Sequence, residues 1–147
     1  MQRFKILLLI VAIAFAIPAT AFANPGSDLL KAAKKGDLAQ VKVLLEKGAD
    51  IDAQTNKGVT ALMKAAMHGH SSVAKLLIEN GADVNINAND GMTALIYAAM
   101  GGYTKIAKLL IEKGANPNAK DKKNGYTALM QAAYKGQTEI VQLLENP

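Results

Sequence analysis

The chain contains two histidines, His68 and His70, and they lie two residues apart. Imidazole nitrogens bind zinc and transfer protons, so this pair is the first place to look for chemistry. A zinc site needs three or four convergent ligands, but the chain has no cysteine and no third histidine. His68 is also expected at the surface, at a position where similar stretches of this chain carry other residues. We therefore expect no metal site and no cofactor.

A catalytic site is equally hard to assemble from these residues. Ser71 and Ser72 follow His70 directly, but they stand where a helix should begin and are interpreted as capping residues. The segment "GGYTK", residues 101–105, lacks the length and the Lys-Ser/Thr ending of a phosphate-binding loop. The sequence predicts no catalytic residue and a protein that is not an enzyme, with an enzyme as the last alternative.

The stretch that holds both histidines nearly recurs twice. "GVTALMKAAMHGH", residues 58–70, returns as "GMTALIYAAMGGY" at 91–103 and as "GYTALMQAAYKGQ" at 125–137. A fixed period of about 33 residues indicates a stack of repeated structural units. One extra residue interrupts the last interval, within "KDKKNG" at 120–125.

Each unit has the signals of two short helices. Thr60, Thr93 and Thr127 precede the repeated Ala-Leu stretch, where a hydroxyl can cap a helix N-terminus. Gly69 ends that first helix, because glycine accepts a left-handed backbone. A second amphipathic helix is predicted over residues 71–80, followed by a turn rich in Asn and Asp.

The 33-residue unit of turn, helix and helix, with "TALMKAA", "GH" and "LLIENGADVN", resembles the ankyrin repeat, whose signature is Thr-Pro-Leu-His-x-Ala. The resemblance covers essentially all of residues 24–147. It implies an all-α fold, an ankyrin-repeat solenoid of four stacked turn-helix-helix units. The predicted units are about 25–54, 55–87, 88–120 and 121–147.

The resemblance also has departures. Met63, Ile96 and Met130 replace the signature histidine, and we expect apolar packing to substitute for its hydrogen bonds. His70 stands where the ankyrin pattern itself favours "GH", so its expected role is structural.

The terminal units differ from the inner ones. The first has Ser27 at the position of the capping threonines and Gln40 at an otherwise apolar position. In the last, Glu145 replaces an inner isoleucine. Polar residues at the ends are typical of capping repeats, so we expect a complete four-unit array that is a monomer.

In ankyrin repeats the turns and first helices line a concave side, where most members of the family bind proteins. The residues that differ between the copies fall on this side, and they are the predicted partner-binding residues. These residues are Lys35, Lys57, Val59, Lys64, Met67, His68, Asp90, Met92, Tyr97, Met100, Tyr126, Tyr134 and Lys135.

Two tyrosines are the expected anchors of this interface. The rings of Tyr97 and Tyr134 are predicted to lie outside the core of the stack, because both occupy variable positions. Met67 and Met100 either join the interface or fill gaps between neighbouring first helices. The surrounding lysines predict a protein partner with acidic character.

The N-terminus has the pattern of a secretory signal peptide. Arg3 and Lys5 precede an apolar run of 12 residues at 6–17, and Ala21-Phe22-Ala23 offers a small-x-small cleavage site. Residues 1–23 are the predicted signal peptide and 24–147 the mature ankyrin repeat domain, starting at Asn24. An uncleaved signal anchor is the alternative, although the run is short for a membrane span.

Removal of two basic residues with the signal lowers the net charge from +5 to +3. That surplus predicts no nucleic-acid partner, and signal cleavage predicts no stable membrane insertion. The expected location is a bacterial periplasm, with the extracellular space second.

The function predicted from the sequence is that of a non-catalytic protein–protein interaction module, exported from the cytoplasm. Two alternatives stay open: a host-directed effector, and a small-molecule or metal-binding accessory protein in stress defence with His68 as its foothold.

Overall fold

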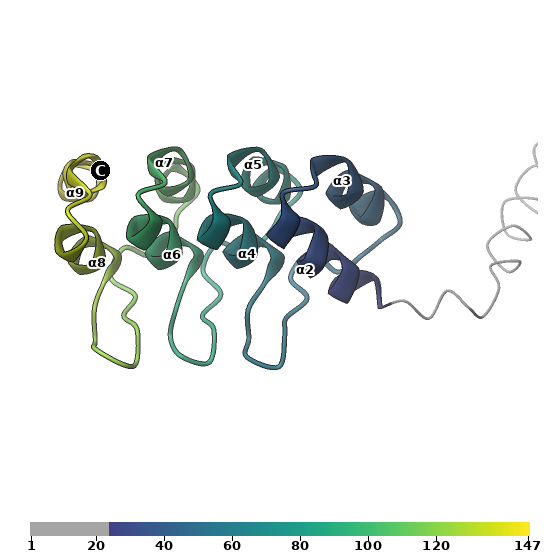
Figure 1. Ribbon diagram of the computed structural model, residues 1–147, viewed down its shortest axis with the longest axis horizontal. Coiled ribbons are helices and arrows are strands. Elements are labelled where there is room, and N and C mark those ends of the chain that lie inside the picture. The colour runs from purple at the N-terminus through teal and green to yellow at the C-terminus, as the bar shows by residue number, and fades with distance from the viewer. Residues whose placement is uncertain (1–23) are drawn as a thin grey trace, which may run out of the picture.

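The structure, a computed structural model, describes residues 24–147, in which eight helices and no strand form four consecutive helix pairs (Figure 1). The predicted all-α solenoid is confirmed for these residues, and the predicted signal peptide lies outside them. The helices are α2 (Pro25–Lys35), α3 (Leu38–Glu46), α4 (Ala61–His68), α5 (Ser71–Glu79), α6 (Ala94–Gly101), α7 (Thr104–Glu112), α8 (Ala128–Tyr134) and α9 (Thr138–Glu145).

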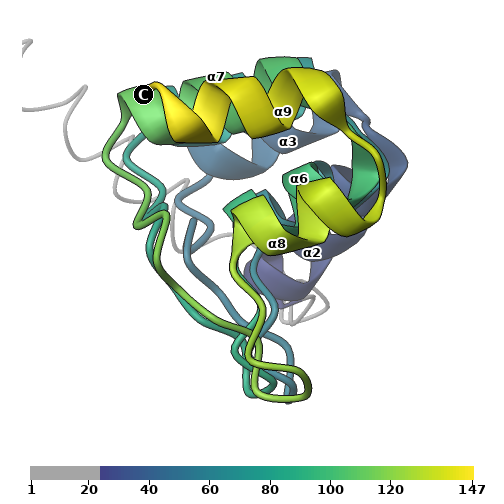
Figure 2. The same cartoon turned by 90° about the vertical axis from the view of Figure 1, so that its left-hand side faces the viewer.

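The helices form two layers. An inner row of α2, α4, α6 and α8 packs beside an outer row of α3, α5, α7 and α9, and neighbouring helices within each row are in contact (Figure 1). The hairpin loops between pairs project away from both layers (Figure 2). We call the inner helices, with the hairpin tips at residues 55–59, 88–92 and 121–126, the inner face. Because each pair contacts only its neighbours, burial at any position depends on the adjacent pair.

Threonine caps start three of the inner helices. The hydroxyl of Thr60 accepts a hydrogen bond from the Met63 backbone N–H at 3.3 Å. Thr93 and Thr127 make the equivalent bonds, at 3.2 and 3.3 Å. Each satisfies an N–H that has no partner within the helix, so the predicted caps are confirmed.

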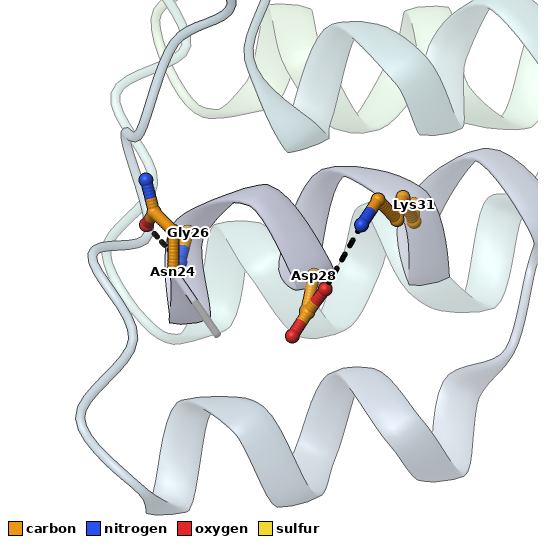
Figure 3. A network of polar contacts seen from close by, with 4 residues as sticks. All are labelled: Asn24, Gly26, Asp28 and Lys31. Carbon is orange, nitrogen blue, oxygen red and sulfur yellow. Dashed lines mark hydrogen bonds and ion pairs between the residues drawn. The ribbon is translucent and has the colours of Figure 1, made fainter. Parts of the chain in front are cut away.

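The first inner helix begins differently (Figure 3). Pro25 is its first residue, and the side chain of Asn24 accepts a hydrogen bond from the Gly26 N–H at 3.1 Å. Asp28 and Lys31 then form an ion pair at 3.2 Å along the same helix. Ser27, which the sequence aligns with the capping threonines, therefore lies inside α2.

Of the outer helices, α3 alone begins with a side-chain cap, in which the Asp37 carboxylate accepts a hydrogen bond of 3.0 Å from the Gln40 N–H. His70 and its equivalents Tyr103 and Gln137 occupy the N-cap positions of α5, α7 and α9, and none makes a capping hydrogen bond. Ser71 is already the first residue of α5, so the predicted capping role of the serines is wrong. Each of the three N-cap side chains instead covers a left-handed glycine of the preceding pair, such as Gly36 under His70.

Alanines allow the inner helices to approach closely, and larger apolar residues fill the space between the two layers. Met63 and Ile96 each expose 1% of their surface, which confirms apolar packing at the position that holds histidine in the ankyrin signature. Met130, at the same position in the last pair, is 48% exposed. The expectation is wrong for Met130, because no further pair among residues 24–147 packs beyond α8.

Candidate protein-binding face

His70 links the first two helix pairs. Its Nε2–H donates a hydrogen bond of 2.9 Å to the carbonyl oxygen of Lys34, in the last turn of α2. That carbonyl has no partner within its helix, so the imidazole satisfies it. The predicted structural role of His70 is confirmed.

His68 lies exposed at the end of α4, with its ring 6.1 Å from that of His70 and inclined by 30°. Desolvation lowers the pKa of His68 below its usual 6.5, and the charges of His70, Lys34 and Lys64 lower it further. Among residues 24–147, no three His, Cys, Asp or Glu side chains gather closely enough to hold a metal ion.

A hollow of about 320 Å³ opens on the inner face between the third and fourth helix pairs. It brings together five of the predicted partner-binding residues, Asp90, Met92, Met100, Tyr134 and Lys135. Asp121, Lys123, Asn124 and Gln131 complete its lining. Most of this second group comes from the loop that carries the extra residue.

Two predicted interface residues are part of the core. Val59 is 8% exposed and Met92 is 9% exposed, because both lie at the end of a hairpin tip, directly before a helix. The backbone N–H of Met92 is held by the Asp90 carboxylate at 3.1 Å, which keeps the tip folded against the stack. The prediction of exposed positions is wrong for both, although Met92 still lines the hollow.

The two predicted anchor tyrosines differ in their surroundings. Tyr97 is half-buried and packs against the core, so the expectation that its ring lies outside the core is wrong. Desolvation raises the pKa of Tyr97, and the charge of Asp90 raises it further. Tyr134 is 76% exposed, with the Lys135 ammonium 5.9 Å from its ring centroid. Of the tyrosine side chains on the inner face, that of Tyr134 is the most exposed.

Asp121 is a site residue that the sequence analysis missed. Its side chain, in a residue only 5% exposed, accepts hydrogen bonds from the N–H of Asn124 at 2.6 Å and of Tyr126 at 3.2 Å. It also accepts a bond of 3.2 Å from the Gln131 side chain. The backbone bond from Asn124 is the main cause that holds the pKa of Asp121 below its usual value, with Gln131 and Tyr126 adding to it.

The extra residue changes the hydrogen bonding within the last hairpin tip. In the second unit the Gly58 N–H donates to the carbonyl of Thr55, three residues earlier, whereas the Gly125 N–H reaches back four residues to Asp121. The Asp121 carboxylate accepts two backbone N–H groups of the wider turn, as the Thr55 hydroxyl accepts those of Lys57 and Val59, and it adds a bond from the Gln131 side chain. Two features of the sequence could have pointed to Asp121. One is the inserted residue in its loop, and the other is Gln131 at the variable position of the signature.

The remaining predicted residues lie outside the hollow. Lys35 is exposed on α2, and Lys57 is exposed in the first hairpin tip. Lys64 and Met67 are half-buried on α4, and Tyr126 is exposed in the last tip. Met100 packs against the core, as expected for a residue that fills a gap between helices, and it also lines the hollow; its place in an interface stays a prediction.

Comparison with known proteins gives one family. A family model described as ankyrin repeats (3 copies) matches residues 29–121 and 86–146. No curated protein matches the chain. Among residues 24–147, none of the helices is long and apolar enough to cross a membrane.

Proposed function

The chain belongs to the ankyrin repeat family, whose repeats are generic protein-interaction modules, and we propose from this premise that it is a non-catalytic module that binds a protein through its inner face. The single observation that carries the choice of face is the exposed ring of Tyr134 at the hollow between α6 and α8, because two hollows along the outer helices of residues 24–147 are lined by no aromatic side chain. An exposed aromatic ring beside a recess is typical of interface anchors.

We also propose that the protein works outside the cytoplasm, in a bacterial periplasm or, second, beyond the cell. The support is the signal-like N-terminus together with the start of α2. Asn24, the first residue after the predicted cleavage, itself provides the cap of α2. Retention of residues 1–23 in a membrane-bound form would overturn this proposal, and the intact mass of the fractionated protein is the measurement.

Site-specific photo-crosslinking tests the binding face. A benzophenone amino acid placed at Tyr134 should give covalent adducts with a protein in the producing cells, because this position is open on the inner face. The matched control carries the same photoreactive residue at Lys108, which is exposed on the outer helix α7. Adducts from position 108 and none from position 134 would overturn the inner-face assignment, and mass spectrometry identifies the captured protein.

A further inference from the structure

The charges of the molecule are distributed unevenly between its two sides. Inner helices and hairpin tips carry exposed or half-buried lysines in the first, second and fourth units. They include Lys34, Lys35, Lys57, Lys64, Lys123 and Lys135.

Few carboxylates oppose these lysines on the same elements. Asp28 is paired with Lys31, and Asp121 is buried in its hydrogen-bonded loop. Among the aspartates of the inner face within residues 24–147, only Asp90 is exposed. The other acidic residues lie on the outer helices and in the segments that lead to and from them, where Glu79, for example, pairs with Lys75 at 3.8 Å.

The hollow adds an apolar contact to this basic surface. Met92 and Met100 supply apolar surface to it, and the ring of Tyr134 stands at its side. Lys123 and Lys135 line the same recess. A volume of about 320 Å³ accommodates one aliphatic side chain with room to spare, so the recess suits a single apolar residue with acidic neighbours.

We propose that the inner face binds an extended acidic segment of a protein, with one aliphatic side chain of that segment seated in the hollow between α6 and α8. This inference rests on the proposed function and names the chemistry of the partner. Neighbouring helices pack roughly 10 Å apart, so the four inner helices span about 30 Å. A strand of about ten residues covers that length, which brings glutamates or aspartates near the lysines of every basic unit.

A nucleic acid fits this face less well. A phosphate backbone needs only the lysines and gains little from a recess lined by two methionines. Stacking of bases uses several exposed aromatic rings along the strand, whereas the inner face offers Tyr134 at the hollow and, with less exposure, Tyr126 in the last hairpin tip. Electrostatic attraction between the lysines and carboxylates speeds encounter, and the seated aliphatic group adds affinity and register.

Labelled synthetic decapeptides test the proposal by fluorescence anisotropy with the purified protein. The first peptide is built of Glu and Asp around one central Leu, the second has Gly in place of Leu, and the third has Lys in place of every acid. Single-stranded oligothymidine is the polyanion control. The Leu peptide should bind about tenfold more tightly than the Gly peptide, and the Lys peptide should not bind.

Three variants locate the site, each checked for an unchanged unfolding midpoint. Tyr134→Ala should remove most of the tenfold preference for Leu over Gly. Lys135→Glu should weaken both acidic peptides about fivefold, and more at low salt. Lys108→Glu, an equal change of charge on the outer helix α7, should change affinity less than twofold.

The results separate the two proposals. Equal affinity for the Leu and Gly peptides, equal losses from Lys108→Glu and Lys135→Glu, or oligothymidine binding more tightly than the peptides would each overturn the acidic-segment proposal. If no acidic peptide binds while position 134 still crosslinks to a protein in cells, this inference fails and the proposed function stands.

Discussion

Nε2 of His70 lies 2.9 Å from the carbonyl oxygen of Lys34, so a histidine of the second helix pair is hydrogen-bonded to the first pair. The same imidazole covers Gly36, the left-handed glycine that ends α2. The histidine pair that first suggested chemistry is thus divided between two roles. His70 holds the stack together, and His68 remains exposed on the inner face.

His70→Ala should lower the free energy of unfolding by about 1–2 kcal/mol, because one inter-repeat hydrogen bond and the packing over Gly36 are lost together. Urea denaturation followed by circular dichroism measures the change. His68→Ala is the control and should cost less than about 0.5 kcal/mol, since His68 is exposed. Equal losses from the two variants would contradict the assigned roles.

The lowered pKa of His68 should make stability depend on pH. The unfolded chain binds the proton more readily than the folded protein, so the contribution of neutral His68 is complete above about pH 6.5. It is lost as the pH falls from 6.5 through the lower folded-state pKa. NMR titration of the ring should give a value below 6.5, and His68→Gln should reduce the loss of stability on acidification. A ring that titrates above 6.5 would be the opposite result.

Asp121→Ala should lower the unfolding midpoint by several degrees, because the N–H groups of Asn124 and Tyr126 and the amide of Gln131 lose their acceptor. Asp90→Ala, in the preceding hairpin tip, should have a smaller effect, since Asp90 is exposed. The pKa of Asp121 is lowered, so its contribution is present above about pH 3.8 and is lost as the pH falls through the folded-state value. Thermal melts at neutral and acidic pH measure both effects.

The two tyrosines should separate stability from binding. Tyr97→Ala should cost about 2–4 kcal/mol of unfolding free energy, because the ring packs against the core. Tyr134→Ala should cost less than about 0.5 kcal/mol and act on partner binding instead. Chemical denaturation of both variants decides this, and a large stability loss for Tyr134→Ala would mean that the ring is not free.

Removal of metal ions should leave the unfolding midpoint unchanged. Nε2 of His70 is hydrogen-bonded to the Lys34 carbonyl. It is therefore not available to bind a metal ion together with the neighbouring His68. Differential scanning calorimetry with and without chelator is the measurement. A drop of several degrees with chelator would restore the two histidines as candidate metal ligands.

The sequence by itself determined the local architecture. The threonine caps and the glycine ends were predictable because each depends on one or two residues and on the backbone next to them. The stacking was predictable because the same letters return at a fixed period. The structural role of His70 followed in the same way from its place in the repeated pattern.

Only the tertiary structure decided which side chains are available to a partner. One repeat position holds Lys31, Lys64, Tyr97 and Gln131; Lys31 is exposed, whereas the other three are wholly or partly buried. Their partners come from different neighbouring segments, which a single repeat does not specify.

The hollow between the third and fourth pairs shows the same limit. Its lining includes Asp121, Lys123 and Asn124, from the hairpin that carries the inserted residue. Met63 and Met130 occupy equivalent positions, yet one is buried by the next helix pair and the other has no pair beyond it among the described residues. Exposure is a property of neighbours in space, and for this reason the composition of the binding face could not be predicted from the repeat alone.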